Sequence, residues 1–256
     1  MDKKIAILGS SGHIGKNLIL YLSKKKNIDL FLFSKNKNKL NNFLNQLSIN
    51  QNKIKVISYS HFEENQYNLI INCTGNRNDL KKNNAEFFKK NRFYDNKIIK
   101  YLKNNRTCLY IYLSSGAIYD GNFLEPINEN SRSILWQKKI KDQYSMAKMD
   151  SEIKHRQLSE LNIIDLRIFS FFSRFLDEKT NFFLTDVLNA LKSQKKLLTS
   201  SLDIQRDYIH PYDLTEIIME FTKKEKINGV FDIHSKKPVK KFEIIKYLKN
   251  KYNQKY

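Results

Sequence analysis

The sequence predicts an α/β fold, in which a doubly wound parallel sheet is followed by a small, shortened C-terminal α/β region. Short apolar runs alternate with longer stretches whose apolar residues recur at helical spacing. Three of only seven glycines fall within residues 9–15, between the first apolar run and the first helical stretch. After about residue 169 the alternation changes, so we expect two regions, residues 1–168 and residues 169–256.

The N-terminal region contains the elements of the expected sheet and its crossover helices. Each expected strand is a short apolar run, which is typical of strands buried on both faces. The expected strands are residues 4–8, 28–33, 53–58, 68–73, 107–113 and 163–168. The expected helices are residues 14–25, 38–47, 85–103 and 141–161, and little room for a full helix remains before the fourth strand. Because strands alternate with helices, we expect a parallel sheet.

The C-terminal region has a different order of elements. We expect a helix at residues 182–192, an extended segment at residues 207–209, a helix from Pro211, a strand at residues 230–233 and a last helix from Val239. The sequence contains no internal repeat and no linker long enough to separate two independent domains. This small unit is therefore expected to pack on the first region.

Composition excludes several classes of protein. Apolar residues make up 41% of the chain, and 17 Phe, 14 Tyr and 1 Trp can fill a substantial core, so we do not expect intrinsic disorder. No stretch approaches the length of a membrane span, and the N-terminus lacks a secretory signal. Cys73 and Cys108 lie inside apolar runs and neither has a Cys-x-x-Cys neighbour, so we expect neither a disulfide framework nor a zinc site. We expect a reduced, cytoplasmic protein with no membrane association.

The net charge of +20 is compatible with nucleic-acid binding. However, only 8 of the 46 basic residues are Arg, whose planar guanidinium is best suited to base edges and phosphates, and Lys is spread over almost every expected helix. A solvated lysine surface is therefore expected ahead of a nucleic-acid partner. Such a surface still attracts a small anionic substrate.

The glycine cluster forms the pattern Gly-x-x-Gly-x-x-Gly between the first strand and the first helix. Glycines at these places allow a tight turn, close approach of the backbone to a pyrophosphate and close helix–strand packing, while the helix N-terminus offers N–H groups to the phosphates. A glycine turn that binds nothing is the alternative. The context favours a Rossmann-type dinucleotide site, with His13 as a packing residue beside the loop. The candidate cofactor-binding residues are Gly9, Ser11, Gly12, His13, Ile14 and Gly15.

The end of the second strand indicates which dinucleotide binds. NAD sites usually carry Asp or Glu there for the ribose hydroxyls, whereas NADP sites lack the acid and favour a cation. Ser34 and Lys35 follow the strand, and both are candidate cofactor-binding residues. The sequence thus predicts an NAD(P) site with a lean to NADP, although Lys is common enough here for Lys35 to stand there by chance.

Tyr144 and Lys148 lie four residues apart at the start of an expected helix, so the phenol and the ammonium share one face. A free phenol ionises at about pH 10, and a nearby cation lowers that value. Ser115, at the carboxyl end of the fifth strand, can hydrogen-bond the reacting oxygen, because catalytic groups gather at this edge of the sheet. Taken alone the pair is a weak signal, since 14 Tyr and many Lys produce such pairs by chance.

Four further segments extend the pattern along the chain. Thr74-Gly75 follow the fourth strand, and Asn91 lies in the long helix. Residues 113–119 read Leu-Ser-Ser-Gly-Ala-Ile-Tyr, and residues 206–210 read Arg-Asp-Tyr-Ile-His. With the glycine loop, these segments resemble the extended short-chain dehydrogenase/reductases, specifically the NAD-dependent epimerase/dehydratase group that acts on nucleotide sugars. The resemblance covers nearly the whole chain.

The resemblance implies roles for individual residues. Thr74 and Gly75 would line the cofactor, and Asn91 and Glu129 stand at places expected for the family. The implied catalytic residues are Ser115, Tyr144 and Lys148, of which Tyr144 and Lys148 also contact the cofactor.

The departures from the family lie mainly on the substrate side. Where the family continues after the sixth strand into Asn-x-x-Gly-Pro, residues 170–174 read Ser-Phe-Phe-Ser-Arg, with Ser173 in place of the glycine. Residues 53–62 hold no aspartate of the kind that contacts adenine, and the chain ends soon after residues 231–233. We therefore expect a shortened substrate-binding region. Its candidate residues are Ser115, Gly116, Ser170 and Arg206, although an ion pair between Arg206 and Asp207 would make Arg206 structural.

The resemblance implies hydride transfer at a sugar carbon, in which Tyr144 moves the hydroxyl proton, Lys148 lowers the pKa of Tyr144 and Ser115 orients the oxygen. An epimerase and a ketoreductase both fit. A dehydratase ranks below them because Gly116-Ala117 follow Ser115, in place of the family's Asp-Glu pair. The rivals are an idle NAD(P)-binding sensor or scaffold and a nucleic-acid binder. The expected partner is a small anionic substrate, a nucleotide sugar, and relatives often form homodimers.

Overall fold

The computed structural model of the chain describes residues 2–75, 84–119, 127, 143–180 and 182–252. At its centre lies a seven-stranded parallel sheet with the order β3-β2-β1-β4-β5-β6-β8. The strands are β1 (Lys3–Leu8), β2 (Ile28–Phe33), β3 (Ile54–Ile57), β4 (Leu69–Asn72), β5 (Leu109–Ser115), β6 (Ile163–Ile168) and β8 (Asn228–Ile233). The predicted Rossmann-type α/β fold is confirmed.

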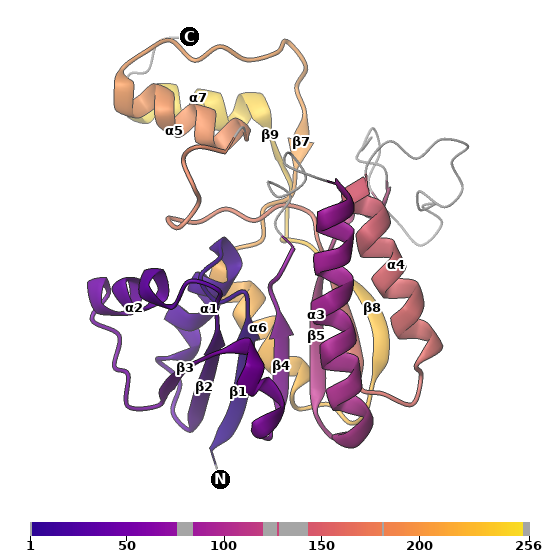
Figure 1. The fold of residues 1–256 in the computed structure, drawn as a ribbon. Coiled ribbons are helices and arrows are strands. Elements are labelled where there is room, and N and C mark those ends of the chain that lie inside the picture. The colour runs from indigo at the N-terminus through magenta and orange to yellow at the C-terminus, as the bar shows by residue number, and fades with distance from the viewer. Residues whose placement is uncertain (1, 76–83, 120–126, 128–142, 181, 253–256) are drawn as a thin grey trace.

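Helices cover both faces of the sheet (Figure 1). One face carries α1 (His13–Leu22), α2 (Lys37–Gln46) and α6 (Pro211–Phe221). The other face carries α3 (Asn84–Asn104) and α4 (Gln143–Gln157). Between β3 and β4 the chain forms only the short 3-10 helix η1 (Tyr59–Glu64), in agreement with the limited room that the sequence predicts there, and a second one, η3 (Gly116–Tyr119), follows β5.

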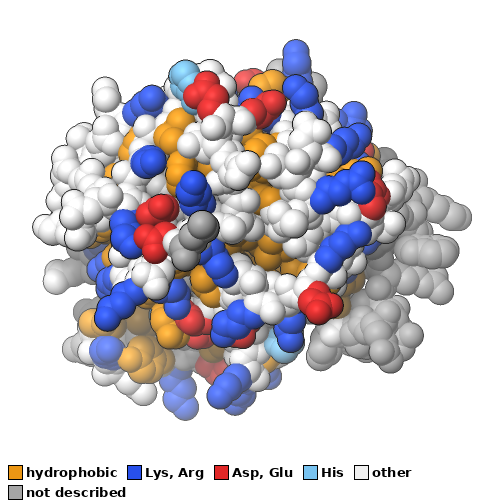
Figure 2. Space-filling model, turned by 90° about the horizontal axis from the view of Figure 1, so that it is seen from below, with side chains coloured by type: hydrophobic (Ala, Val, Ile, Leu, Met, Phe, Trp, Pro, Cys, Tyr) orange, Lys and Arg blue, Asp and Glu red, His pale blue; other side chains and the backbone are white. Residues whose placement is uncertain are grey.

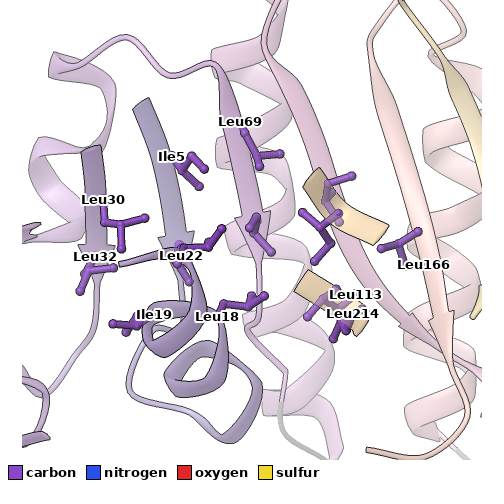
Figure 3. Packing of buried hydrophobic residues seen from close by; sticks show 14 of the residues in the cluster. Ile5, Leu18, Ile19, Leu22, Leu30, Leu32, Leu69, Leu113, Leu166 and Leu214 are labelled. Atoms are coloured by element: carbon purple, nitrogen blue, oxygen red, sulfur yellow. The ribbon is translucent and has the colours of Figure 1, made fainter. Parts of the chain in front are cut away.

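The strands are buried on both faces because alternate side chains enter different layers. In β1, Ile5 and Ile7 belong to the core under α1, whereas Ala6 and Leu8 belong to the core under α3. Figure 3 shows the first layer, where helix residues pack against leucines and isoleucines from several strands. The labelled helix residues are Leu18, Ile19, Leu22 and Leu214, and the strand residues are Ile5, Leu30, Leu32, Leu69, Leu113 and Leu166.

A smaller unit lies beyond the carboxyl ends of the strands (Figure 1). It contains α5 (Phe183–Ser193), β7 (Gln205–Arg206), β9 (Val239–Lys240) and α7 (Lys241–Tyr252). β7 pairs antiparallel with β9. Its own small core is made of buried apolar side chains from α5, the following loop and α7, namely Val187, Ala190, Leu197 and Ile245.

The C-terminal part of the chain is shared between the sheet and the smaller unit. The strand expected at residues 230–233 is β8, which adds to β6 in parallel, with Ile163 opposite Asn228 and Ile168 opposite Ile233. α6 packs in the same apolar layer as α1. The chain thus returns to the sheet after residue 169, and β8 becomes its edge strand. The division at residues 168 and 169 stays a prediction.

The face at the amino ends of the strands carries dispersed charge. Figure 2 shows this face from below, with Lys and Arg side chains scattered among Asp, Glu and apolar side chains. Such a distribution is typical of a solvated surface rather than of a single basic patch.

In the ranges described above, no helix has the length and apolar character needed to cross a membrane.

Candidate active site

The candidate site lies where β1 meets β4. β1 has β2 on one side and β4 on the other, so the connections leave it in opposite directions, and open α/β sheets bind ligands at such a point. A cleft of about 1100 Å³ opens there, between the sheet and the smaller unit. The predicted residues that line it are Ser11, Gly12, His13, Ile14, Thr74, Gly75, Ser115, Tyr144, Lys148, Ser170 and Arg206.

The glycine loop is shaped by close backbone contacts. Gly9 has a φ of +71°, and a Cβ atom on it would lie 2.8 Å from the carbonyl oxygen of Cys73. A Cβ atom on Gly15 would lie 2.7 Å from the carbonyl oxygen of Gly9. Gly12 is the N-cap of α1 and offers no side chain to the first N–H groups of the helix. Gly9 and Gly15 therefore allow the backbone of the loop to pack closely, and Gly12 leaves the N-terminus of α1 open to an anion.

The end of β2 lies beside the glycine loop. Ser34 Oγ donates a hydrogen bond of 2.8 Å to Ser11 Oγ, so the two predicted cofactor-binding serines are joined. Lys35 does not line the main cleft. Instead, Ser34 and Lys35 line a second hollow of about 560 Å³, together with residues 36–38 and residues 58–60. None of these residues is acidic.

Tyr59 is a residue of the site that sequence reasoning missed. Its hydroxyl accepts a hydrogen bond of 3.0 Å from the N–H of Gly9 and lies 3.2 Å from the carbonyl oxygen of Phe33, to which it donates. Burial raises the pKa of this phenol, so the hydroxyl stays neutral. Tyr59 thus holds the end of β2 against the start of the glycine loop, within the stretch that lacks the family's adenine-contacting aspartate.

Lys148 and Tyr144 lie on one face of α4, as the spacing predicts. The Lys148 side chain is buried, and its Nζ lies 5.7 Å from the ring centroid of Tyr144 and 4.5 Å from that of Tyr112. Nζ donates a hydrogen bond of 2.8 Å to the carbonyl oxygen of Leu113. Burial lowers the pKa of Lys148 to about 8, although Asp95 and other acids oppose the shift. The half-buried Tyr144 packs on Phe87, with ring centroids 5.6 Å apart.

Ser115 is the last residue of β5 and reaches the cleft from the strand end. Its Oγ accepts a hydrogen bond of 3.2 Å from the N–H of Ala117. Gly116 is buried below it, and a Cβ atom there would overlap the ring of Phe169. Gly116 therefore supports the turn after Ser115 and does not itself line the cleft.

Two asparagines hold segments that border the cleft. Asn72 Oδ1 accepts hydrogen bonds from both the N–H and the hydroxyl of Thr74, at 3.0 and 2.6 Å. Asn91, the structural asparagine that the resemblance implies, accepts from the Tyr112 hydroxyl and donates to Ser151 on α4. These bonds join α3 to β5 and α4 behind the cleft. Glu129 lies outside the residues that the structure describes.

The lining of the cleft also includes aromatic and cationic side chains. Arg206, in β7, lines it, while Asp207 accepts hydrogen bonds from the N–H and hydroxyl of Ser235. Asp207 is thus engaged elsewhere, and the Arg206 side chain bonds the carbonyl oxygen of Gln205. Ser170 lines the cleft and its carbonyl oxygen accepts from the N–H of Ile209. Besides Arg206 and Lys148, the cations in the lining are Lys16, Lys39, Arg174, Lys179 and Lys241.

A buried ion pair behind the site also escaped sequence reasoning. Glu152, one helical turn beyond Lys148, accepts hydrogen bonds from Ser114 Oγ and from the guanidinium of Arg167. Arg167 in turn lies within hydrogen-bond distance of the Tyr119 hydroxyl. The repeated spacing of four residues, from Tyr144 through Lys148 to Glu152, is a signal that could have revealed it.

A second buried cluster lies further along α4. His155 is fully buried, with Nδ1 2.6 Å from Asp165 and Nε2 2.8 Å from Asp95. Burial lowers the pKa of His155, but Asp165 and Asp95 outweigh this and raise it to about 9. The imidazolium therefore joins α3, α4 and β6 through Asp95 and Asp165.

A dinucleotide fits the geometry of this edge. The open N-terminus of α1 offers N–H groups, the joined Ser11 and Ser34 offer hydroxyl groups beside it, and Ser34 also lines the second hollow. Across the ranges that the structure describes, no group of three or more His, Cys, Asp and Glu side chains could hold a metal ion. The arrangement thus supports a dinucleotide site with a proton-transfer pair at its side.

Known structures share this fold. The UDP-N-acetylglucosamine 4-epimerase of Methanobrevibacter ruminantium, in complex with UDP-N-acetylmuramic acid, has a TM-score of 0.78 at 18% identity, over 97% of this chain and 82% of that one. The ADP-L-glycero-D-manno-heptose-6-epimerase of Helicobacter pylori has a TM-score of 0.79 at 16% identity, over 97% and 82%. The UDP-glucuronic acid 4-epimerase of Bacillus cereus, in complex with UDP-glucuronic acid and NAD, has a TM-score of 0.77 at 16% identity, over 96% and 82%.

The family is shown by the sequence itself. No curated protein matches the chain. The sequence model of the NAD dependent epimerase/dehydratase family, however, matches residues 5–233, from β1 to the end of β8. The match includes the glycine loop, Ser115, Tyr144 and Lys148. The chain therefore belongs to the NAD dependent epimerase/dehydratase family, whose members are enzymes of the extended short-chain dehydrogenase/reductase type.

Proposed function

We propose that the protein is an NAD(P)-dependent nucleotide-sugar epimerase or ketoreductase that uses Ser115, Tyr144 and Lys148. One observation carries the proposal. The glycine loop, with the open N-terminus of α1, and these three side chains line the same cleft of about 1100 Å³. An idle dinucleotide-binding module would need the loop but would have no chemical use for the three side chains.

The three side chains have separate roles in the proposed reaction. Tyr144 takes the proton of the sugar hydroxyl or returns it, as a general acid–base group. The Lys148 ammonium favours the phenolate form of Tyr144, and it is held in place by the Leu113 carbonyl. Ser115 donates a hydrogen bond to the reacting oxygen. A nicotinamide dinucleotide bound at the glycine loop supplies the hydride acceptor or donor.

The substrate is proposed to be a nucleotide sugar. The cations of the cleft, among them Lys16, Arg174 and Arg206, favour an anionic ligand, which a diphosphate would provide. Structural relatives are named as enzymes of UDP-sugars and of an ADP-sugar, which supports the same substrate class. NADP is proposed as the preferred cofactor. The hollow at the end of β2 is lined by Lys35 and by no acid, and such a site favours the 2′-phosphate of NADP over the free ribose hydroxyl of NAD.

Mass spectrometry of the purified protein under non-denaturing conditions tests the proposal. A retained NAD favours the epimerase, because an epimerase returns the hydride and keeps its cofactor, and an exchangeable NADP favours the ketoreductase. A co-purified nucleotide sugar would name the substrate class. The native mass also shows whether the protein forms a homodimer, as its relatives often do.

A Tyr144→Phe variant separates an enzyme from a binding module. We expect it to retain NAD(P) binding and to lose turnover of UDP-, ADP- or dTDP-sugars by at least about 100-fold. Tyr21→Phe, near the C-terminal end of α1 and outside the cleft, is the matched control and should leave turnover unchanged. Turnover that survives in Tyr144→Phe would refute the proposed mechanism.

A further inference from the structure

The hydroxyl of Ser173 joins the segment after β6 to the start of α1. Ser173 lies 160 positions from His13 in the chain, yet its Oγ lies 2.8 Å from Nε2 of His13 and 2.8 Å from Nδ2 of Asn17. It also accepts a hydrogen bond of 3.2 Å from the N–H of Phe175. Because a glycine has no hydroxyl, a protein that keeps the family's glycine at this place cannot form these bonds.

The partners of Ser173 decide which nitrogen of His13 carries the proton. The carbonyl oxygen of His13 can only accept, and it lies 2.8 Å from the Nδ2 of Asn17, which is therefore a donor. Asn17 and the N–H of Phe175 thus use both lone pairs of Ser173 Oγ. The hydroxyl proton is left for Nε2 of His13. The ring consequently accepts at Nε2 and carries its own proton on Nδ1.

The ring is uncharged as well as fixed in one tautomer. Burial, with the nearby charge of Lys16, lowers the pKa of His13 to about 4. The ring packs edge-on against Phe171, with ring centroids 4.9 Å apart. Nδ1–H is then the only donor of the ring, and no group in the described part of the chain accepts a hydrogen bond from it.

We propose that His13 is a phosphate-binding residue that donates from Nδ1–H, and that Ser173 is the positioning residue that holds it in this tautomer. The inference rests on the proposed function, since the phosphate is that of the dinucleotide or of the nucleotide sugar. His13 is the first residue of α1 and lines the cleft next to Gly12. The N–H groups at that helix end attract the same anion, and a neutral ring adds a donor that stays in place throughout the neutral pH range.

Two substitutions separate the two nitrogens of the ring. The amide nitrogen of Asn can take the place of Nδ1, and the amide of Gln can take the place of Nε2. We expect His13→Asn to bind the phosphate ligand within about threefold of the wild type, and His13→Gln to bind it about tenfold more weakly. Wild-type affinity in His13→Gln would overturn the proposal, and so would the reverse order of the two variants.

The choice of ligand identifies the source of the phosphate. The dissociation constants of NAD⁺ and NADP⁺ report on the dinucleotide, and that of UDP, measured on the protein saturated with dinucleotide, reports on the nucleotide sugar. A loss of affinity of about tenfold in His13→Gln, for either the dinucleotide or UDP, supports the proposal. If the wild type binds neither NAD⁺ nor NADP⁺, the proposed function fails and this inference fails with it. If a dinucleotide binds and His13→Gln changes the dissociation constant of neither the dinucleotide nor UDP, only this inference fails.

NMR of nitrogen-labelled histidine reads the tautomer directly in the wild type. The signal of His13 among the 5 histidines is assigned from its loss in His13→Gln. We expect the Nδ1–H tautomer in the wild type and in Ser173→Thr, which keeps the hydroxyl, and a mixture of tautomers in Ser173→Ala. An Nε2–H tautomer in the wild type, or an unchanged spectrum in Ser173→Ala, would contradict the role given to Ser173.

Discussion

The ammonium of Lys148 donates a hydrogen bond of 2.8 Å to the carbonyl oxygen of Leu113. Leu113 lies two residues before Ser115 in β5, and Lys148 lies four residues after Tyr144 in α4. The bond therefore ties the helix that carries the proposed base to the strand that carries the proposed hydroxyl. Because Lys148 is only 1% exposed, water cannot replace this bond if it is lost.

The charge of Lys148 predicts the alkaline side of the pH profile. Burial lowers the pKa of Lys148 to about 8, so the side chain is charged below that pH and neutral above it. Only the charged form favours the Tyr144 phenolate, so we expect kcat to fall as the pH rises through about 8. In Lys148→Arg the cation persists, and the fall should move to higher pH. A profile unchanged in Lys148→Arg would assign the fall to another group.

Glu152 should matter more for stability than a surface acid does. It is buried and accepts from Ser114 and from Arg167, whose side chain is 18% exposed. Glu152→Ala leaves that guanidinium without its carboxylate, and we expect it to lower the free energy of unfolding by about 3 to 5 kcal/mol. Urea denaturation measures this loss.

A matched control for Glu152 comes from the surface of the same helix. Asp150 pairs with Arg92, where the two side chains are 35% and 58% exposed. Asp150→Ala should therefore cost less than about 1 kcal/mol. Similar losses in Glu152→Ala and Asp150→Ala would show that the buried pair contributes no more than a surface pair.

The buried His155 makes stability depend on pH. Its pKa is raised from 6.5 to about 9 in the folded protein, so folding favours the protonated form. The resulting stabilisation is fully present below pH 6.5 and is lost progressively as the pH rises to about 9. We expect the free energy of unfolding to fall by about 3 kcal/mol over this window, measured by urea denaturation at each pH.

The contribution of His155 is isolated by two substitutions. His155→Gln should be less stable than the wild type and should show a flatter pH dependence between pH 6.5 and about 9. His61 bonds Glu64 on the surface and is the control, since His61→Gln should change the free energy of unfolding by less than about 0.5 kcal/mol. A slope that survives in His155→Gln would place its origin in other groups.

The fold could be predicted from the sequence because its signals are local. Apolar runs such as residues 4–8 predict strands buried on both faces, and Ile5 and Ala6 do enter opposite layers. The site could be predicted where its residues share an element, as Tyr144 and Lys148 do on α4. The sequence assigns the strand at residues 230–233 to the smaller C-terminal region, whereas it is β8 of the sheet. No local pattern says which strand it will pair with.

The contacts that complete the site link distant parts of the chain, and for that reason they could not be predicted. The hydroxyl of Tyr59 supports Gly9 from 50 positions away, and Ser173 reaches His13 from 160 positions away. Neither pair has a fixed spacing that physical reasoning can recognise. Only the departure at Ser173 marked the segment as unusual, and what that hydroxyl bonds became visible only in the fold.

Lys35 should discriminate between the two dinucleotides. It lines the hollow at the end of β2 beside Ser34, where no acid is available for the ribose hydroxyls of NAD and where a cation can pair with the 2′-phosphate of NADP. We expect Lys35→Ala to weaken NADP⁺ binding about tenfold and NAD⁺ binding less than about twofold, as measured by titration calorimetry. Lys26→Ala, exposed at the opposite end of β2, controls for the general loss of positive charge and should weaken both equally and slightly. Equal losses for the two cofactors in Lys35→Ala would remove the argument for NADP and leave NAD as the cofactor that the family match supports.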